Sequence, residues 1–220
     1  MTQERARGLM DKYVQSLPLK DITERQYKGY ITLHPMAAYI ENLHIIASSA
    51  EWQKTSYTDT TLNITRIQFN PNLLLWKGAQ EIKFINGIEF QAKLSFEELS
   101  QILALNNPNL SEFNLWFDGG HIFIQGFFEL LKSRFEFDGT LILTPSGELK
   151  YHVLDIINEE GELVRSKQVY AMLDENLNFT IPIRIMNQSI KLDRIEILED
   201  GVKFEGKSEK PNDDDLIQQD

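Results

Sequence analysis

Histidine is the first residue type to consider for chemistry in this chain, because imidazole acts as a general base and as a metal ligand near neutral pH. The four histidines show no His-x-x-x-His spacing; they are His34, His44, His121 and His152. A single histidine on a strand is more often a solvated or hydrogen-bonded residue than a ligand. The sequence therefore predicts no metal site.

Other signatures of catalysis are also absent from the sequence. There is no cysteine, which excludes thiolate nucleophiles, zinc fingers, iron–sulfur clusters and disulfides. No G-x-x-x-x-G-K or G-x-G-x-x-G loop occurs to hold phosphates, and no G-x-S-x-G nucleophile turn. The acids Glu97 and Glu98 open a helix, where capping and the helix dipole account for them, and Asp213–Asp215 lies in a polar tail. We expect a protein that is not an enzyme and needs no cofactor.

Length and charge limit the partners. The chain has 220 residues, 42% of them hydrophobic and 25% charged, as in ordinary globular proteins. Its 22 Lys and Arg against 33 Asp and Glu give a net charge of −11, which disfavours nucleic acid because phosphate binding requires a basic surface. No segment reaches the run of roughly 18 apolar residues that a membrane-spanning helix requires, and residues 1–5 lack the apolar run of a signal peptide.

The first twenty residues predict an amphipathic helix. Apolar residues recur at helical spacing between residues 4 and 17, and Pro18 ends the pattern. They are Ala6, Leu9, Met10, Tyr13, Val14 and Leu17. The segment is slightly basic in an acidic chain. We expect the helix to pack on the core of its own domain; the alternative is a helix lying on a membrane surface.

Residues 24–94 switch to the pattern of strands and turns. We expect a short helical turn over residues 35–40, a strand over 43–47, and a hairpin over 81–94 that turns at Asn86-Gly87. After that turn apolar and polar residues alternate, which is typical of an antiparallel strand with one buried face.

A second helix is predicted over residues 95–105 from strong local signals. Ser95 and Glu98 form a capping box at its start, and Leu94 and Leu99 flank this box as a hydrophobic staple. The spacing therefore predicts that Ser95 is the N-cap residue.

Most of the remaining chain is predicted as strands rich in phenylalanine. Turn signals separate them at Asp118-Gly119-Gly120, Pro145-Ser146-Gly147, Glu160-Gly161 and Asp200-Gly201. Residues 165–176 are ambiguous and also fit a helix, and the acidic tail, residues 207–220, is predicted to be disordered. Because no repeat or linker interrupts the pattern, we predict a single α+β domain over residues 1–206, dominated by antiparallel strands.

The order of these segments resembles the LmeA-like family, bacterial phospholipid-binding proteins long grouped as a domain of unknown function. The resemblance covers residues 4–206 and is carried by two motifs: A-x-hydrophobic-S/T-x-x-E/D-L at residues 92–99 and D-G-V-x-F-x-G at residues 200–206. The chain departs from the family at Glu41-Asn42, where members often have glycine, although asparagine tolerates the same left-handed backbone. It also shows no export leader of the kind with which members commonly begin.

The resemblance implies a fold like the tubular lipid-binding (TULIP) domains, in which a strongly curved antiparallel sheet wraps around a helix as an elongated half-barrel. It implies a non-enzymatic protein that binds, and by extension transfers, a phospholipid or another acyl-chain lipid in an apolar groove. The expected groove residues lie on apolar strand faces and are Phe84, Phe90, Phe135, Phe137, Phe179, Ile181 and Ile183. The same residues also fit an ordinary packed core.

Peripheral membrane contact is expected at one apolar run, although a buried loop would explain the run as well. Its residues are Leu73, Leu74, Leu75 and Trp76. The expected location is membrane-associated: the cell envelope if an export leader has been removed, and the cytoplasmic face of the membrane otherwise. Two alternatives stay open: a ligand-free soluble scaffold or interaction domain, and, as the weaker one, an enzyme or accessory protein of lipid-linked glycan metabolism.

Overall fold

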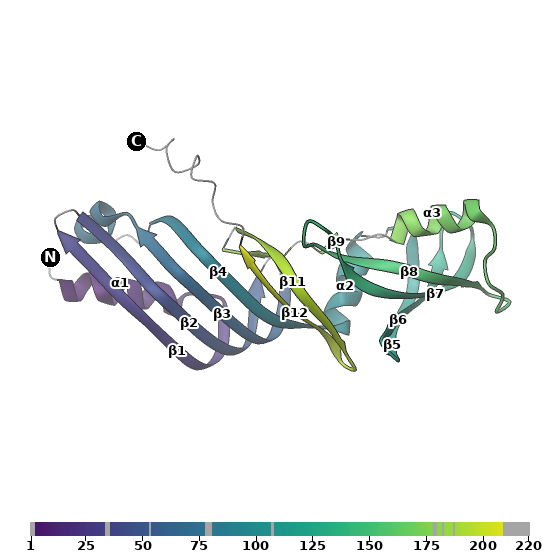
Figure 1. Cartoon of the computed structure of the whole chain (residues 1–220), viewed down its shortest axis with the longest axis horizontal. Coiled ribbons are helices and arrows are strands. Elements are labelled where there is room, and N and C mark those ends of the chain that lie inside the picture. Colours follow the sequence, from purple (N-terminus) through teal and green to yellow (C-terminus); the bar gives the residue numbers. More distant parts are fainter. Residues whose placement is uncertain are drawn as a thin grey trace. The chain divides into compact units, whose positions relative to one another are not determined.

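The protein is an α+β structure built mainly from antiparallel strands (Figure 1). The structure is a computed structural model, and it describes residues 3–33, 36–52, 54–77, 81–106, 108–177, 180–181, 183–186 and 188–208. The strands form a seven-stranded sheet of order β1-β2-β3-β4-β12-β11-β10 and a five-stranded sheet of order β5-β6-β7-β8-β9. This confirms the predicted class and the antiparallel pairing.

The chain divides into two compact units. Unit 1 comprises Met1–Ala92, Arg184–Ile190 and Gly206–Asp220, and unit 2 comprises Lys93–Ile183 and Lys191–Glu205. The extent of a single domain over residues 1–206 stays a prediction. Strand β12 continues to Ser208, past the predicted end of the domain, and residues 209–220 of the predicted tail lie outside the described residues.

Unit 1 consists of a helix on long neighbouring strands. Its elements are α1 (Gln3–Gln15), β1 (Leu19–Leu33), β2 (Met36–Trp52), β3 (Thr55–Phe69), the short π-helix η1 (Leu73–Lys77), β4 (Ile82–Ser95) and β10 (Arg184–Ile185). The last three residues of β4, after Ala92, belong to unit 2. Figure 1 shows α1 lying across one face of the sheet. The helix buries Met10 and Val14, as its apolar spacing predicts, and Leu17, two positions past its end, is buried as well.

Unit 2 contains the five-stranded sheet and the other two described helices. Its elements are α2 (Phe96–Asn106), β5 (Leu110–Asp118), β6 (His121–Phe128), β7 (Ser133–Leu143), β8 (Leu149–Asn158), α3 (Lys167–Leu177), β9 (Thr180–Ile181) and most of β11 (Gln188–Leu198) and β12 (Gly201–Ser208). Strand β6 alternates buried and less buried residues, so one of its faces packs into the core and the other is partly open to solvent. The Ser95 hydroxyl accepts the backbone N–H of Glu98 at 3.2 Å, which confirms the predicted N-cap of α2.

Two sequence-based predictions of local structure are wrong. The expected helical turn over residues 35–40 is instead the start of β2 from Met36 onward, where Ile40 pairs with Gly29 of β1. The expected hairpin at Asn86-Gly87 is instead part of the continuous strand β4. Gly87 has a φ of 66° and lies so close to Thr65 that a Cβ would collide with that side chain, so the glycine serves a close approach of two strands.

Candidate functional site

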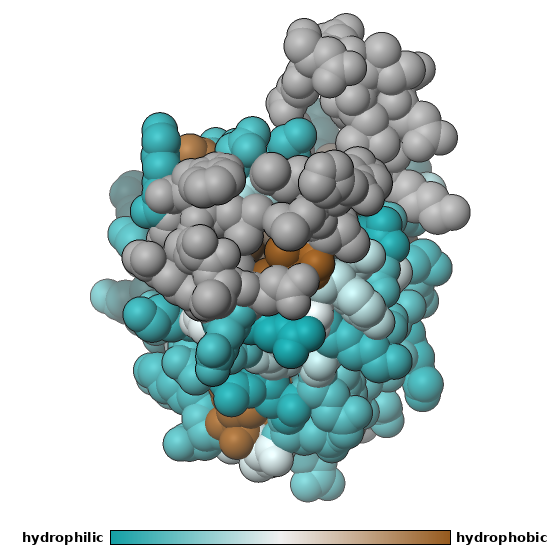
Figure 2. Space-filling model, turned by 90° about the vertical axis from the view of Figure 1, so that its left-hand side faces the viewer, coloured by the Kyte–Doolittle hydropathy of each residue, from teal (hydrophilic) through white to brown (hydrophobic). Residues whose placement is uncertain are grey.

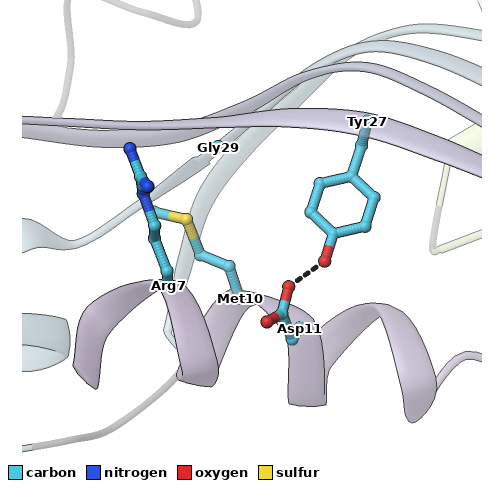
Figure 3. A pocket seen from close by; sticks show the side chains of 5 residues that line it. All are labelled: Arg7, Met10, Asp11, Tyr27 and Gly29. Atoms are coloured by element: carbon cyan, nitrogen blue, oxygen red, sulfur yellow. Dashed lines mark hydrogen bonds between the residues drawn. The ribbon is translucent and has the colours of Figure 1, made fainter. Parts of the chain in front are cut away.

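A partly open cavity lies in unit 1, between α1 and β1. Its volume is about 200 Å³, and it is lined by Arg7, Met10, Asp11, Tyr27 and Gly29. In Figure 3 the three helix residues project towards the strand, and Tyr27 projects from the strand towards the helix. A helix and the first strand of a sheet therefore build this site together.

Local geometry explains why these residues share one space. Arg7, Met10 and Asp11 are separated by three and four positions and so lie on one side of α1. Tyr27 and Gly29 are two positions apart on β1 and so lie on one face of the strand. Gly29 supplies no side chain, and a Cβ built there would lie 3.4 Å from Met10 Sδ. The missing side chain leaves part of the space between helix and strand open.

A bulge lies opposite Tyr27. The register of β1 and β2 shifts between Gln26 and Lys28, and Asn42 of β2 has a φ of 51° there. Asparagine therefore adopts the left-handed backbone that the sequence led us to expect at this position, although within a strand and not at a turn. A bulge bends its strand and increases the local twist.

The two charged side chains of the cavity differ in their hydrogen bonding. The Tyr27 hydroxyl donates a hydrogen bond to the Asp11 carboxylate, which links β1 to α1 (Figure 3). Arg7 is exposed and has no hydrogen bond or ion pair with another described residue. The carboxylate thus has a partner, whereas the guanidinium is available to an anion. Guanidinium groups bind carboxylates and phosphates through paired hydrogen bonds.

Helix α1 is held to the rest of unit 1 through Tyr13. Its ring packs edge-on against Phe69 with centroids 5.4 Å apart, and its hydroxyl donates to Met186 Sδ at 3.8 Å. Burial raises the pKa of the Tyr13 hydroxyl to about 12. These contacts fix the helix next to the cavity.

In unit 1, the predicted groove residues include a closely packed aromatic. Phe84 is half-buried, whereas Phe90 is buried and meets Trp52 and Tyr57 edge-on at centroid distances of 5.3 and 5.7 Å. Such a cluster is typical of a packed core. Neither Phe84 nor Phe90 lines the cavity between α1 and β1.

The other predicted groove residues belong to unit 2. Phe135 and Phe137 are buried with ring centroids 6.1 Å apart, and Ile183 is buried. Phe135 lines a second cavity of about 280 Å³. Phe179 and the side chain of Ile181 lie outside the described residues. The predicted set is thus divided between two units.

The expected membrane-contact run forms the π-helical segment η1. Leu73 is half-buried and Leu74 is fully buried, so Leu74 packs inside unit 1 and does not face solvent. The side chains of Leu75 and Trp76 lie outside the described residues. The face of the protein drawn in Figure 2 is mostly hydrophilic, and its visible apolar residues form small separate patches.

Sequence reasoning missed the residues of the α1–β1 cavity as a site. Met10 belonged to the predicted apolar stripe, but nothing in the sequence distinguished it from an ordinary core residue. Gly29 carried the one usable signal, because a lone glycine inside a strand often marks the close approach of another group.

Comparison with known proteins identifies no relative. No family model, no curated protein and no solved structure matches the chain. No described helix is long and apolar enough to cross a membrane. In the part of the chain that the structure describes, no group of three or more histidine, aspartate or glutamate side chains is placed to hold a metal ion.

Proposed function

We propose that unit 1 binds an acyl-chain lipid with an anionic head group, the chain entering between α1 and β1 and the head group meeting Arg7. The observation that carries this proposal is the cavity between helix and strand, with Met10 and Gly29 along it and, beside it, the Arg7 guanidinium, which has no partner among the described residues. The lining is mixed, with Met10 and the Tyr27 ring beside the charged Arg7 and Asp11, and a cation next to an apolar side chain suits a phospholipid or a fatty acid. The protein acts by binding, and no catalytic step is required.

The size of the cavity limits how much of a lipid enters without rearrangement. About 200 Å³ is below the roughly 300–1,000 Å³ of typical small-molecule sites. Met10 has a flexible side chain that can repack, and a longer chain would have to move α1 away from the sheet. Each buried methylene stabilises the complex by about 0.8 kcal/mol, which offsets the cost of separating the helix from the strands.

The half-barrel shape expected from the resemblance is part of the same proposal. We take unit 1 to be a TULIP-like half-barrel, with α1 inside the curve of its sheet, as the resemblance to the LmeA-like family implies. Two features support this: α1 lies across the faces of long antiparallel strands, and a bulge at Asn42 bends one of them.

Charge supports unit 1 as the part that meets a membrane. Unit 1 has 13 Lys and Arg and 14 Asp and Glu, a net charge of −1, whereas unit 2 has 9 and 19, a net charge of −10. Membranes with anionic lipids repel unit 2 strongly and the nearly neutral unit 1 hardly at all. We therefore propose a membrane-associated protein, in the cell envelope or at the cytoplasmic face.

The test is equilibrium binding of a fluorescent fatty acid and of a fluorescent phosphatidic acid to four variants. Gly29→Leu places a side chain in the cavity, and Gly8→Leu is its control, because a Cβ at Gly8 meets nothing within 4 Å. Arg7→Gln removes the cation, and Arg25→Gln is its control at an exposed position of β1.

We expect Gly29→Leu and Arg7→Gln each to weaken binding by roughly tenfold, the size of one lost charged hydrogen bond or of a few buried methylenes. The two control variants should bind like the natural chain. Equal affinity in Gly29→Leu and Gly8→Leu would show that the lipid does not use this cavity.

A ligand-free scaffold is the second candidate, and the packing of Phe90 favours it. This predicted groove residue is 2% exposed and is enclosed by Trp52 and Tyr57. A fully packed interior with no saturable lipid binding would support the scaffold.

A further inference from the structure

The outer face of the five-stranded sheet in unit 2 has a row of stacked rings. Trp116 of β5 stacks on Phe123 of β6 with centroids 5.5 Å apart and planes 10° apart, and His121 stacks on the same Phe123 at 6.2 Å and 20°. Trp116 is 37% exposed, whereas the neighbouring residues Ile122 and Ile124 are fully buried on the opposite face. Part of the Trp116 ring is thus in contact with water.

The cavity of about 280 Å³ lies on this same face. Its lining includes Gln125 of β6, Arg134 and Glu136 of β7, and Glu159 in the turn after β8. Phe123 and Gln125 are two residues apart on β6, so both project to the outer face. Gln125 is also the register partner of Glu136. The rings and the cavity are therefore neighbours within one sheet face, which we call the aromatic–acidic face.

The charges of this face are only partly neutralised. Arg134 forms an ion pair with Glu112, and His121 bonds Asp138 at 2.7 Å. Glu136 is half-buried, and no other described residue forms a hydrogen bond or ion pair with its side chain. Arg134 lines the same cavity, but its ion pair is with Glu112. The half-buried Glu136 carboxylate is therefore not paired with a cation among the described residues, and a basic ligand would stabilise it.

We propose that the aromatic–acidic face binds a basic peptide segment of a partner protein, with an arginine of that segment in the cavity against Glu136 and a second basic side chain over Trp116. Charge complementarity selects this occupant, because unit 2 has a net charge of −10 and would repel phosphates and anionic membranes. Arginine fits better than lysine, since its planar guanidinium pairs with a carboxylate and stacks on aromatic rings. This site does not depend on the lipid site of unit 1.

The experiment titrates the full chain with a fluorescent hexa-arginine peptide that has acetylated and amidated ends. Hexa-lysine and hexa-glutamate peptides with the same ends provide the comparison. Glu136→Gln removes the carboxylate with little change of shape, and Glu196→Gln removes the same charge at an exposed position of β11 in unit 2. Trp116→Leu removes the ring, and circular dichroism checks its fold.

We expect saturable binding of hexa-arginine, weaker binding of hexa-lysine and none of hexa-glutamate. Glu136→Gln should weaken the hexa-arginine affinity by roughly tenfold, the value of one charge-assisted hydrogen bond, and Glu196→Gln by less than about twofold. If Glu136→Gln and Glu196→Gln weaken the hexa-arginine affinity equally, the binding reflects only the net negative charge of unit 2, and the proposal is overturned. Binding that does not saturate would overturn it as well. If Trp116→Leu fails to fold, the comparison of the two glutamate variants still decides.

Discussion

Replacing Gly139 with alanine tests the packing of unit 2 where a buried tyrosine covers a glycine. Gly139 lies on β7, and the side chain of Tyr151 from β8 covers it. A Cβ at this position would lie 2.5 Å from Tyr151 Cζ, 2.6 Å from its hydroxyl oxygen and 2.6 Å from the carbonyl oxygen of His152. Real Cβ atoms do not approach other atoms so closely, so the ring has to move.

The movement has two costs. Overpacking a filled core costs about 1–3 kcal/mol. Tyr151 is fully buried, and its hydroxyl lies 3.0 Å from the carbonyl oxygen of Ile122 and 3.2 Å from that of Phe137. Loss of this buried hydrogen bonding costs about 1–3 kcal/mol more. We therefore expect Gly139→Ala to lower the free energy of unfolding by about 2–5 kcal/mol.

Urea denaturation followed by circular dichroism measures the effect. The partner variant Tyr151→Phe should cost about 1–2 kcal/mol alone. In the Tyr151→Phe background, Gly139→Ala should lower the free energy of unfolding by less, because the added Cβ no longer meets the tyrosine hydroxyl oxygen. Gly8→Ala is the control, since its added Cβ meets nothing within 4 Å and alanine favours the helix by about 1 kcal/mol. An unchanged urea midpoint in Gly139→Ala would refute this description of the core.

Three further predictions concern stability. Ser95→Ala should lower the free energy of unfolding by about 1 kcal/mol in urea denaturation, because the hydroxyl caps the N–H of Glu98 at 3.2 Å; an unchanged midpoint would mean that the cap contributes nothing. Thr60→Val should raise the melting temperature, because the Thr60 hydroxyl is fully buried without a hydrogen-bond partner among the described residues, whereas a lower temperature would indicate a missed partner. The free energy of unfolding should fall as pH rises from 10 to 12, by up to about 1.4 kcal/mol per pH unit from Tyr13, because the pKa of this hydroxyl is near its ordinary value of 10.0 in the unfolded chain and about 12 in the folded one. Tyr13→Phe should make this decline shallower, and an identical decline in both proteins would contradict the assignment.

Local sequence signals predicted the elements that depend on neighbouring residues. The capping box at Ser95 and the apolar stripe through Met10 and Val14 each specify a helix within a few positions, and both helices form. The helical alternative for residues 165–176 is also confirmed by α3.

Elements that depend on distant partners were harder to predict. Asn86-Gly87 has the composition of a hairpin turn, yet it lies inside β4 because the strand continues past Thr65 of its neighbour. The α1–β1 cavity likewise depends on Gly29 being brought over Met10, and neither residue by itself marks a site in the sequence. Such sites follow from tertiary packing, which no local pattern encodes.

The most direct test of lipid binding is a titration of the purified protein with fatty acids of increasing chain length, read by native mass spectrometry. The proposal predicts a saturable complex whose affinity rises with each added methylene, by at most about fourfold from 0.8 kcal/mol of burial, until the space between α1 and the sheet is filled. The absence of a saturable complex at every chain length, or an affinity independent of chain length, would contradict it.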